Sequence, residues 1–200
     1  MCRRSRADDI GVLTDLRADL LRLVDPSKPY ADNRWNTRAI VGAFLRSQGA
    51  WAVAEFRFRH WTRTLSRPAR MALSPVTFFT YKLIEILAGI SIDAKAQIGP
   101  GFFIVHYSCI FVGPIVAGPN LSISQGVTIG IEKGALPTLG EHVYLAPGVQ
   151  VFGPVTMGDR SAAGANAVVN RDVPAEVTVA GVPARPVGQR TPTVALREAA

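Results

Sequence analysis

Residues 139–169 read LGEHVYLAPGVQVFGPVTMGDRSAAGANAVV, and an apolar residue recurs there at every sixth position. These residues are Leu139, Leu145, Val151, Met157, Ala163 and Val169. Neither an α-helix nor a sheet meander requires such a period. A coil with three flat sides does, because each side takes about six residues and places one of them in the interior. The stretch therefore predicts a parallel β-helix of hexapeptide repeats, whose coils stack only on their neighbours.

The same spacing extends upstream of this stretch. It begins at Ile98, Ile104 and Ile110, slips by one residue, and returns at Ala117, Ile123 and Ile129. Residues 131–138 interrupt the period and are expected to loop out of the coil, and from about residue 171 the repeat decays.

The residues before the repeats have a helical character. Apolar side chains at helical spacing predict helices over 10–24 and 37–65, with a polar loop at 26–36 and a third helix over 76–90. We therefore expect a mainly β protein with an N-terminal helical region at 1–90, a β-helix domain at 91–188 and a flexible tail at 189–200.

Composition narrows the function classes. The chain has 200 residues and a net charge of +7, but it lacks the aromatic-plus-basic pattern of nucleic-acid binding. Its two cysteines, Cys2 and Cys109, lack the spacing of a disulfide framework or zinc site, so we expect no metal and a reducing compartment, the cytoplasm. We expect no signal peptide, and no apolar run approaches the length of a membrane span.

Residues 92–188 resemble the hexapeptide-repeat acyltransferases with a left-handed β-helix, in the serine acetyltransferase branch. The residues that carry the resemblance are AQIGPG at 96–101, His106, SQGVTIG at 124–130, GANAVV at 164–169 and AGVPAR at 180–185. Within that branch the chain looks most similar to exopolysaccharide acetyltransferases of the colanic-acid type, on LRAD at 16–19 and FRFRHW at 56–61. The left hand of the helix is implied by this resemblance.

Acetyl transfer from a thioester to a hydroxyl needs a base, and neutral imidazole suits that role near pH 7. His106 matches the family's catalytic histidine, so the resemblance implies that it is the base. The other histidines are alternatives. His60 lies in a predicted helix, where packing is the usual role, and His142 follows the loop at 131–138 and could face a cleft.

The chain departs from the family at several positions. Ser91 stands where the family has an aspartate that supports the base, and Asp93 could replace it because side chains two apart on a strand share a face. Val105 replaces the aspartate before the catalytic histidine, and Ala135-Leu136 replace an Arg-His pair that serves the amino-acid acceptor. Since a carboxylate favours a bidentate arginine, these departures favour a neutral sugar hydroxyl over L-serine.

The resemblance implies acetyl-CoA as the donor, bound in a groove between two subunits. Its wall would be formed by Gly130, Pro147, Gly164 and Ala165, with Arg185 meeting a CoA phosphate. The resemblance also implies a homotrimer. Three roles are open for the helical region, which could cap the first coil, add further subunits or rest against the inner face of a membrane.

Four functions are therefore to be weighed. The first expectation is an acetyl-CoA-dependent O-acetyltransferase acting on a sugar of an exopolysaccharide or its precursor. Serine O-acetylation for cysteine synthesis is the main alternative, and a non-catalytic β-helix scaffold is another. A carbonic-anhydrase-like β-helix needs three metal-binding histidines, and one of the chain's three histidines falls in the helical region.

Overall fold

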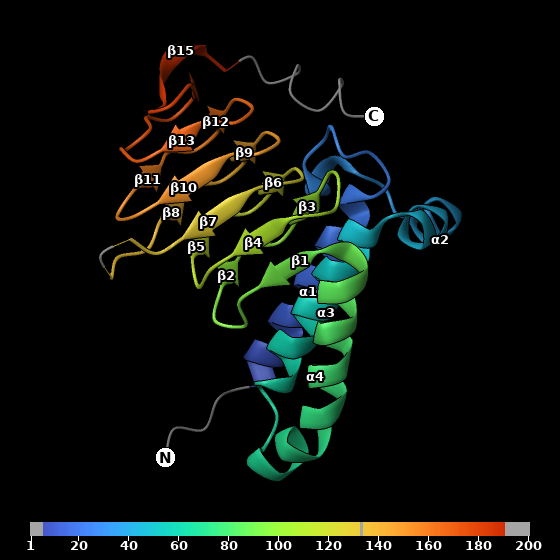
Figure 1. Ribbon diagram of the computed structural model, residues 1–200. Coiled ribbons are helices and arrows are strands. Elements are labelled where there is room, and N and C mark those ends of the chain that lie inside the picture. Colours follow the sequence, from blue (N-terminus) through green and yellow to red (C-terminus); the bar gives the residue numbers. More distant parts are fainter. Residues whose placement is uncertain (1–5, 133, 191–200) are drawn as a thin grey trace.

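The computed structural model describes residues 6–132 and 134–190, which form a group of helices followed by a stack of β-coils (Figure 1). The helices are α1 (Arg6–Arg22), α2 (Thr37–Arg46), α3 (Gln48–Thr62) and α4 (Arg67–Ala88), with the 3-10 turn η1 (Tyr30–Asp32) after α1. Residues 191–200, which make up most of the expected tail, lie outside the described residues.

Parallel sheets form the sides of the coil stack. Sheet A contains β1 (Ile90–Ile92), β4 (Ile110–Val112), β7 (Thr128–Gly130), β10 (Gln150–Phe152) and β13 (Val168–Val169). Sheet B contains β2 (Gln97–Ile98), β5 (Val116–Ala117), β8 (Thr138–Leu139) and β11 (Thr156–Met157). Sheet C contains β3 (Phe103–Ile104), β6 (Ser122–Ile123), β9 (Tyr144–Leu145), β12 (Ala162–Ala163), β14 (Val177–Ala180) and β15 (Arg185–Gln189), the last antiparallel to β14.

The six-residue period is confirmed as the interior of a parallel β-helix. Leu145 pairs in register with Ile123 on one side and Ala163 on the other, and all three are fully buried. The structure corrects the period at one point, because Val112 and not Ile110 stacks against Ile129. The reason is a longer connection after Ile104, which delays the interior position to residue 112.

The helical region differs from the prediction most at two places, apart from shifts of two to four residues at the ends of α1 and α3. The expected helix over 37–65 is two helices, because Ser47 takes an extended backbone and its hydroxyl accepts a hydrogen bond from the Ala50 N–H as the cap of α3. Helix α4 begins at Arg67, nine residues before the prediction, and continues through Pro75. The Met71 carbonyl, which loses its usual donor at Pro75, accepts the Ser74 hydroxyl instead at 2.8 Å.

Helix α4 exposes an apolar face. Among the described residues it is the one helix that by length and composition alone could cross a membrane, and 6% of the relevant window is buried. Its exposed apolar side chains include Met71, Phe78, Phe79 and Ile86. The sequence contains no unbroken apolar run as long as a membrane span. The helix is therefore apolar only on average, because polar residues interrupt its apolar ones.

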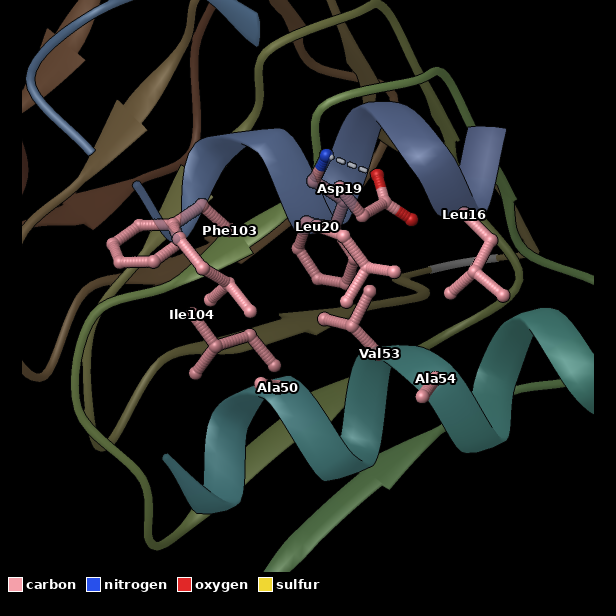
Figure 2. A pocket seen from close by; sticks show the side chains of 10 residues that line it. Leu16, Asp19, Leu20, Ala50, Val53, Ala54, Phe103 and Ile104 are labelled. Carbon is pink, nitrogen blue, oxygen red and sulfur yellow. Dashed lines mark hydrogen bonds between the residues drawn. The ribbon is translucent and has the colours of Figure 1, made fainter. Parts of the chain in front are cut away.

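The helical region packs directly on the first coil. Figure 2 shows Leu16 and Leu20 of α1 facing Val53 of α3, with Ile104 of β3 beside them, around a cavity of only about 10 Å³. In the same place the backbone N–H of Phe102 donates to the Asp19 carboxylate at 2.8 Å. The helices therefore close the end of the hydrophobic column where the β-helix begins.

Changing Gly158 to alanine is expected to destabilise the protein by about 1–3 kcal/mol, because the coils are too close to accept a methyl group. A Cβ there would lie 2.5 Å from the Ala175 nitrogen and 2.9 Å from the Pro174 carbonyl carbon, both of them backbone atoms. Chemical denaturation measures the change. The matched control is Gly188→Ala, where the new Cβ meets nothing within 4 Å, and equal stability of both variants would contradict the tight coil spacing.

Candidate active site

His106 lies on an exposed corner where the chain passes from sheet C to sheet A. This corner is the longer connection between Ile104 and Val112. Two successive non-glycine residues within it, Ser108 and Cys109, have φ values of 96° and 53°. Such conformations cost energy and concentrate at functional sites, so the geometry of this corner is consistent with a functional role.

The register of sheet C places one residue of each successive coil at the same corner. Two positions after the stacked residues Ile104, Ile123, Leu145 and Ala163 come His106, Gln125, Pro147 and Ala165. Backbone hydrogen bonds join neighbouring coils here, from Gly148 N to Gln125 O at 2.9 Å and from Asn166 N to Pro147 O at 2.8 Å. We call this line of residues the C–A corner.

The predicted donor-binding residues divide into two groups. Pro147 and Ala165 lie on the C–A corner, and Gly164 directly precedes Ala165. Arg185 of β15 joins them, because it pairs with Ala180, and the Ala180 methyl lies beside Gly164. Gly130 lies elsewhere, since it ends β7 in sheet A, is buried and pairs with Phe152. One protomer therefore does not gather the whole predicted set on one surface.

Asp93 is engaged in its own turn. Its carboxylate accepts the backbone N–H of Lys95 at 2.7 Å, and Ser91 exchanges a hydrogen bond of 2.8 Å with the Tyr81 hydroxyl. Within residues 6–132 and 134–190, neither Asp93 nor Ser91 forms a hydrogen bond with His106. The role of Asp93 as a support for the base stays a prediction.

Gln125 lies near His106, and no role is predicted for it from the sequence. Counted from the end of its sheet C strand, it matches His106, although the longer corner of the first coil places Ser108 opposite it, since Gly126 N donates to Ser108 O at 3.0 Å. Its side-chain oxygen is buried without a hydrogen-bond partner in the described part of the chain. An unpaired buried acceptor is costly, so this amide is suited to a donor supplied from outside the chain. The sequence signal was its place in the motif at 124–130.

The other two histidines occupy different surroundings. His60 packs edge-on against Phe56 in α3, with ring centroids 5.2 Å apart, and burial together with Arg57 lowers its pKa. His142 lies before β9, at the opposite end of the sheet C strands from His106, and it lines a cavity. Neither histidine lies on the C–A corner.

No family model matches the chain, but individual relatives do. The chain is 33% identical over 189 residues to the serine acetyltransferase of Mycobacterium tuberculosis, a match that covers 91% of this chain and 76% of the relative. It is 31% identical over 183 residues to the serine acetyltransferase of Helicobacter pylori strain J99, covering 88% of this chain and 98% of the relative.

The solved structures that are similar to the chain are also serine acetyltransferases. The chain matches the crystal structure of serine acetyltransferase from Brucella abortus with a TM-score of 0.73 and 26% identity, over 94% of this chain and 72% of that one. It also matches serine acetyltransferase from Neisseria gonorrhoeae in complex with serine, with a TM-score of 0.70 and 27% identity over 91% and 71% of the two chains. A structure of the Brucella enzyme in complex with coenzyme A matches with a TM-score of 0.70 and 25% identity, over 91% and 68%.

Proposed function

We propose that this chain, which belongs to the serine acetyltransferase family of left-handed β-helix acyltransferases, transfers an acetyl group. The donor is acetyl-CoA, and the acceptor is the hydroxyl of L-serine. The observation that carries the proposal is the similarity to the Mycobacterium tuberculosis enzyme, which extends through the helical region as well as the coils. The family membership makes the chain an acyltransferase with acetyl-CoA as co-substrate. The alternative of a non-catalytic β-helix scaffold is therefore not supported.

The expectation of a sugar acceptor is wrong. It relied on Ala135-Leu136, where the family resemblance led us to expect an arginine for the carboxylate of serine. The relatives at 31–41% identity are serine acetyltransferases, and the similar Neisseria structure holds serine itself. The error was to assume that the cation for a carboxylate must stand at one loop position.

His106 is proposed as the general base. Its exposed position on a strained corner supports this role, because a base must reach the acceptor hydroxyl. The neutral imidazole would take the proton as the serine oxygen attacks the thioester carbonyl carbon. When the tetrahedral intermediate collapses, the carbon–sulfur bond breaks and the imidazolium returns the proton to the leaving thiolate.

The C–A corner is proposed as one wall of the acetyl-CoA groove. Pro147, Gly164 and Ala165 keep that corner free of large side chains, and the exposed Arg185 guanidinium is available for a phosphate. Gly130, on another side of the same chain, would join this groove only across a subunit boundary. That separation supports a groove shared between two protomers.

A homotrimer is proposed as the working assembly. Exposed apolar side chains on the coils, including Phe111, Val116 and Ile131, together with the outer face of α4, support contacts with further protomers. A peripheral membrane contact of α4 is the second proposal for that face. The cytoplasm is proposed as the location, since the exposed Cys109 forms no disulfide among the described residues and thiols persist under reducing conditions.

The test is release of free thiol from acetyl-CoA with L-serine as acceptor. We expect turnover that saturates with L-serine and mass-spectrometric detection of O-acetylserine. D-glucose and N-acetylglucosamine serve as controls for a sugar acceptor, and turnover on either that equals turnover on serine would contradict the proposal. Light scattering on the same sample should give three times the chain mass of 21.5 kDa.

A further inference from the structure

A second cavity lies between the helical region and the β-helix, away from the C–A corner. Its volume is about 230 Å³, and its walls come from the end of α1, the loop before η1, the corners that precede the sheet C strands, and the residue after β15. The polar side chains that decide its character are Arg22, Lys28, His142, Arg160 and Arg190. His106 follows the sheet C strands, whereas these corner residues precede them.

Two of the guanidinium groups in this cavity have no carboxylate partner within the described residues. Arg22 is 2% exposed and donates to neutral acceptors, namely the Gly101 and Pro26 carbonyls, the Ser122 hydroxyl and the Asn120 amide oxygen. Its Nε is buried with no hydrogen-bond partner. Arg190 donates through Nη1 to the carbonyls of His142 and Ser161.

The other charged side chains of the cavity form their ion pairs with other residues, not with Arg22 or Arg190. Arg160 is held by Glu141 and Glu176 at the exposed rim, and Lys28 by Asp25. Burial lowers the pKa of Arg22 to about 10; the charges of Asp19 and Asp25 act in the opposite direction, and that of Arg190 adds to the lowering. Holding a second positive charge, that of the partly exposed Arg190, near the buried Arg22 is unfavourable unless an anion compensates them.

The hydrogen bonds around His142 add a further donor. The Asn120 oxygen accepts from the Tyr30 N–H at 3.0 Å and from Arg22, which leaves its NH₂ group to donate to His142 Nε2 at 3.5 Å. A neutral imidazole that accepts this bond at Nε2 has its proton on Nδ1. Burial, followed by Arg22, Arg190 and Arg160, lowers the pKa of His142, whereas Glu141 raises it.

We propose that this cavity is a binding site for a small doubly charged tetrahedral oxyanion of the phosphate or sulfate class, separate from the acetyl-transfer site. Two guanidinium groups without an ion-pair partner among the described residues match a dianion better than a single carboxylate. The hydrogen-bond donors around the cavity come from the helical region, the coils and the end of β15. A tetrahedral anion could accept hydrogen bonds from all three parts of the chain at once.

Calorimetry with inorganic sulfate tests the site, because sulfate keeps both charges across neutral pH. Arg22 has too many structural hydrogen bonds to be a clean probe, so the test variant is Arg190→Gln. We expect its sulfate affinity to fall by about tenfold or more. The matched control is Arg171→Gln, an exposed arginine outside the cavity, which should bind sulfate as the unmodified chain does.

Two further measurements separate the site from the transferase centre. At a concentration ten times the dissociation constant, sulfate should raise Tm by about 3–6 °C relative to chloride of equal ionic strength. Sulfate should also raise the pKa of His142, measured by NMR. Neither effect is expected in Arg190→Gln. Saturating CoA or L-serine should leave sulfate binding intact. Displacement by either, equal binding by Arg190→Gln, or no binding at all would overturn the proposal, whatever the acetyl-transfer assay shows.

Discussion

Replacing His106 with alanine is expected to lower kcat for the proposed acetyl transfer to L-serine by about 10²–10⁴-fold, the contribution of a general base. The loss is expected in kcat more than in KM, because the imidazole takes the proton as the transition state forms. Its exposed position means that the fold tolerates the change, so Tm should stay close to that of the unmodified chain. Steady-state kinetics with a thiol reagent, and a thermal melt of the same sample, measure both quantities.

The control for this variant comes from the same corner. Tyr107 is the next residue and is 47% exposed, and Tyr107→Phe removes one hydroxyl without altering the backbone. We expect it to retain nearly full activity. Unchanged kcat in His106→Ala would refute the assignment of the base, whereas equal losses in both variants would mean that the corner acts through its shape.

The interior of the β-helix could be predicted because geometry imposes it. Each flat side places one residue inward, so the six-residue period of Leu139 to Val169 determines which side chains stack. The corner of His106 could not be placed the same way. Ile110 and Val112 are both apolar and both buried, so no residue pattern shows which of them continues the stack.

The candidate site was predictable only where neighbouring coils repeat one another. Once the register is known, Pro147 and Ala165 fall in line with His106. The basic cavity follows no such repeat, because Arg22, His142 and Arg190 are brought together from three separate elements by the closure of the helical region on the coils. No local pattern in the sequence encodes that closure.

The acceptor was misjudged for a related physical reason. The absence of an arginine at 135–136 is a statement about one loop, and this loop lies outside the coil stack between β7 and β8. A carboxylate can be bound by donors from other elements, or from a neighbouring protomer, and single-residue matching does not detect these. Similarity over the whole chain was the stronger evidence.

Replacing Arg57 with methionine is expected to destabilise the protein by about 3–5 kcal/mol, because it leaves the buried Asp19 carboxylate without its partner. Arg57 Nε lies 2.7 Å from an Asp19 oxygen, and both side chains are almost fully buried. The guanidinium also donates to the carbonyls of Ile98 and Gly99 at 2.8 Å, so one side chain joins α1, α3 and the first coil. Thermal unfolding should show Tm lowered by about 6–20 °C.

An exposed ion pair provides the control for this prediction. Lys82 pairs with Glu85 on α4 with both side chains partly open to solvent, so Lys82→Gln should leave Tm nearly unchanged. A similar small effect of Arg57→Met would show that water reaches Asp19, and that the buried pair does not hold the two regions together.

The double variant Asp19→Leu with Arg57→Met separates the charge from the hydrogen bonds. Removing both charges also removes the free-energy cost of burying an unpaired carboxylate. Buried ion pairs can often be replaced by apolar side chains with little loss of stability. Here recovery should be partial, because the Phe102 N–H and the carbonyls of Ile98 and Gly99 still lose their partners. Full recovery would mean that these backbone groups find water, and that the interface between the helices and the first coil depends on apolar packing alone.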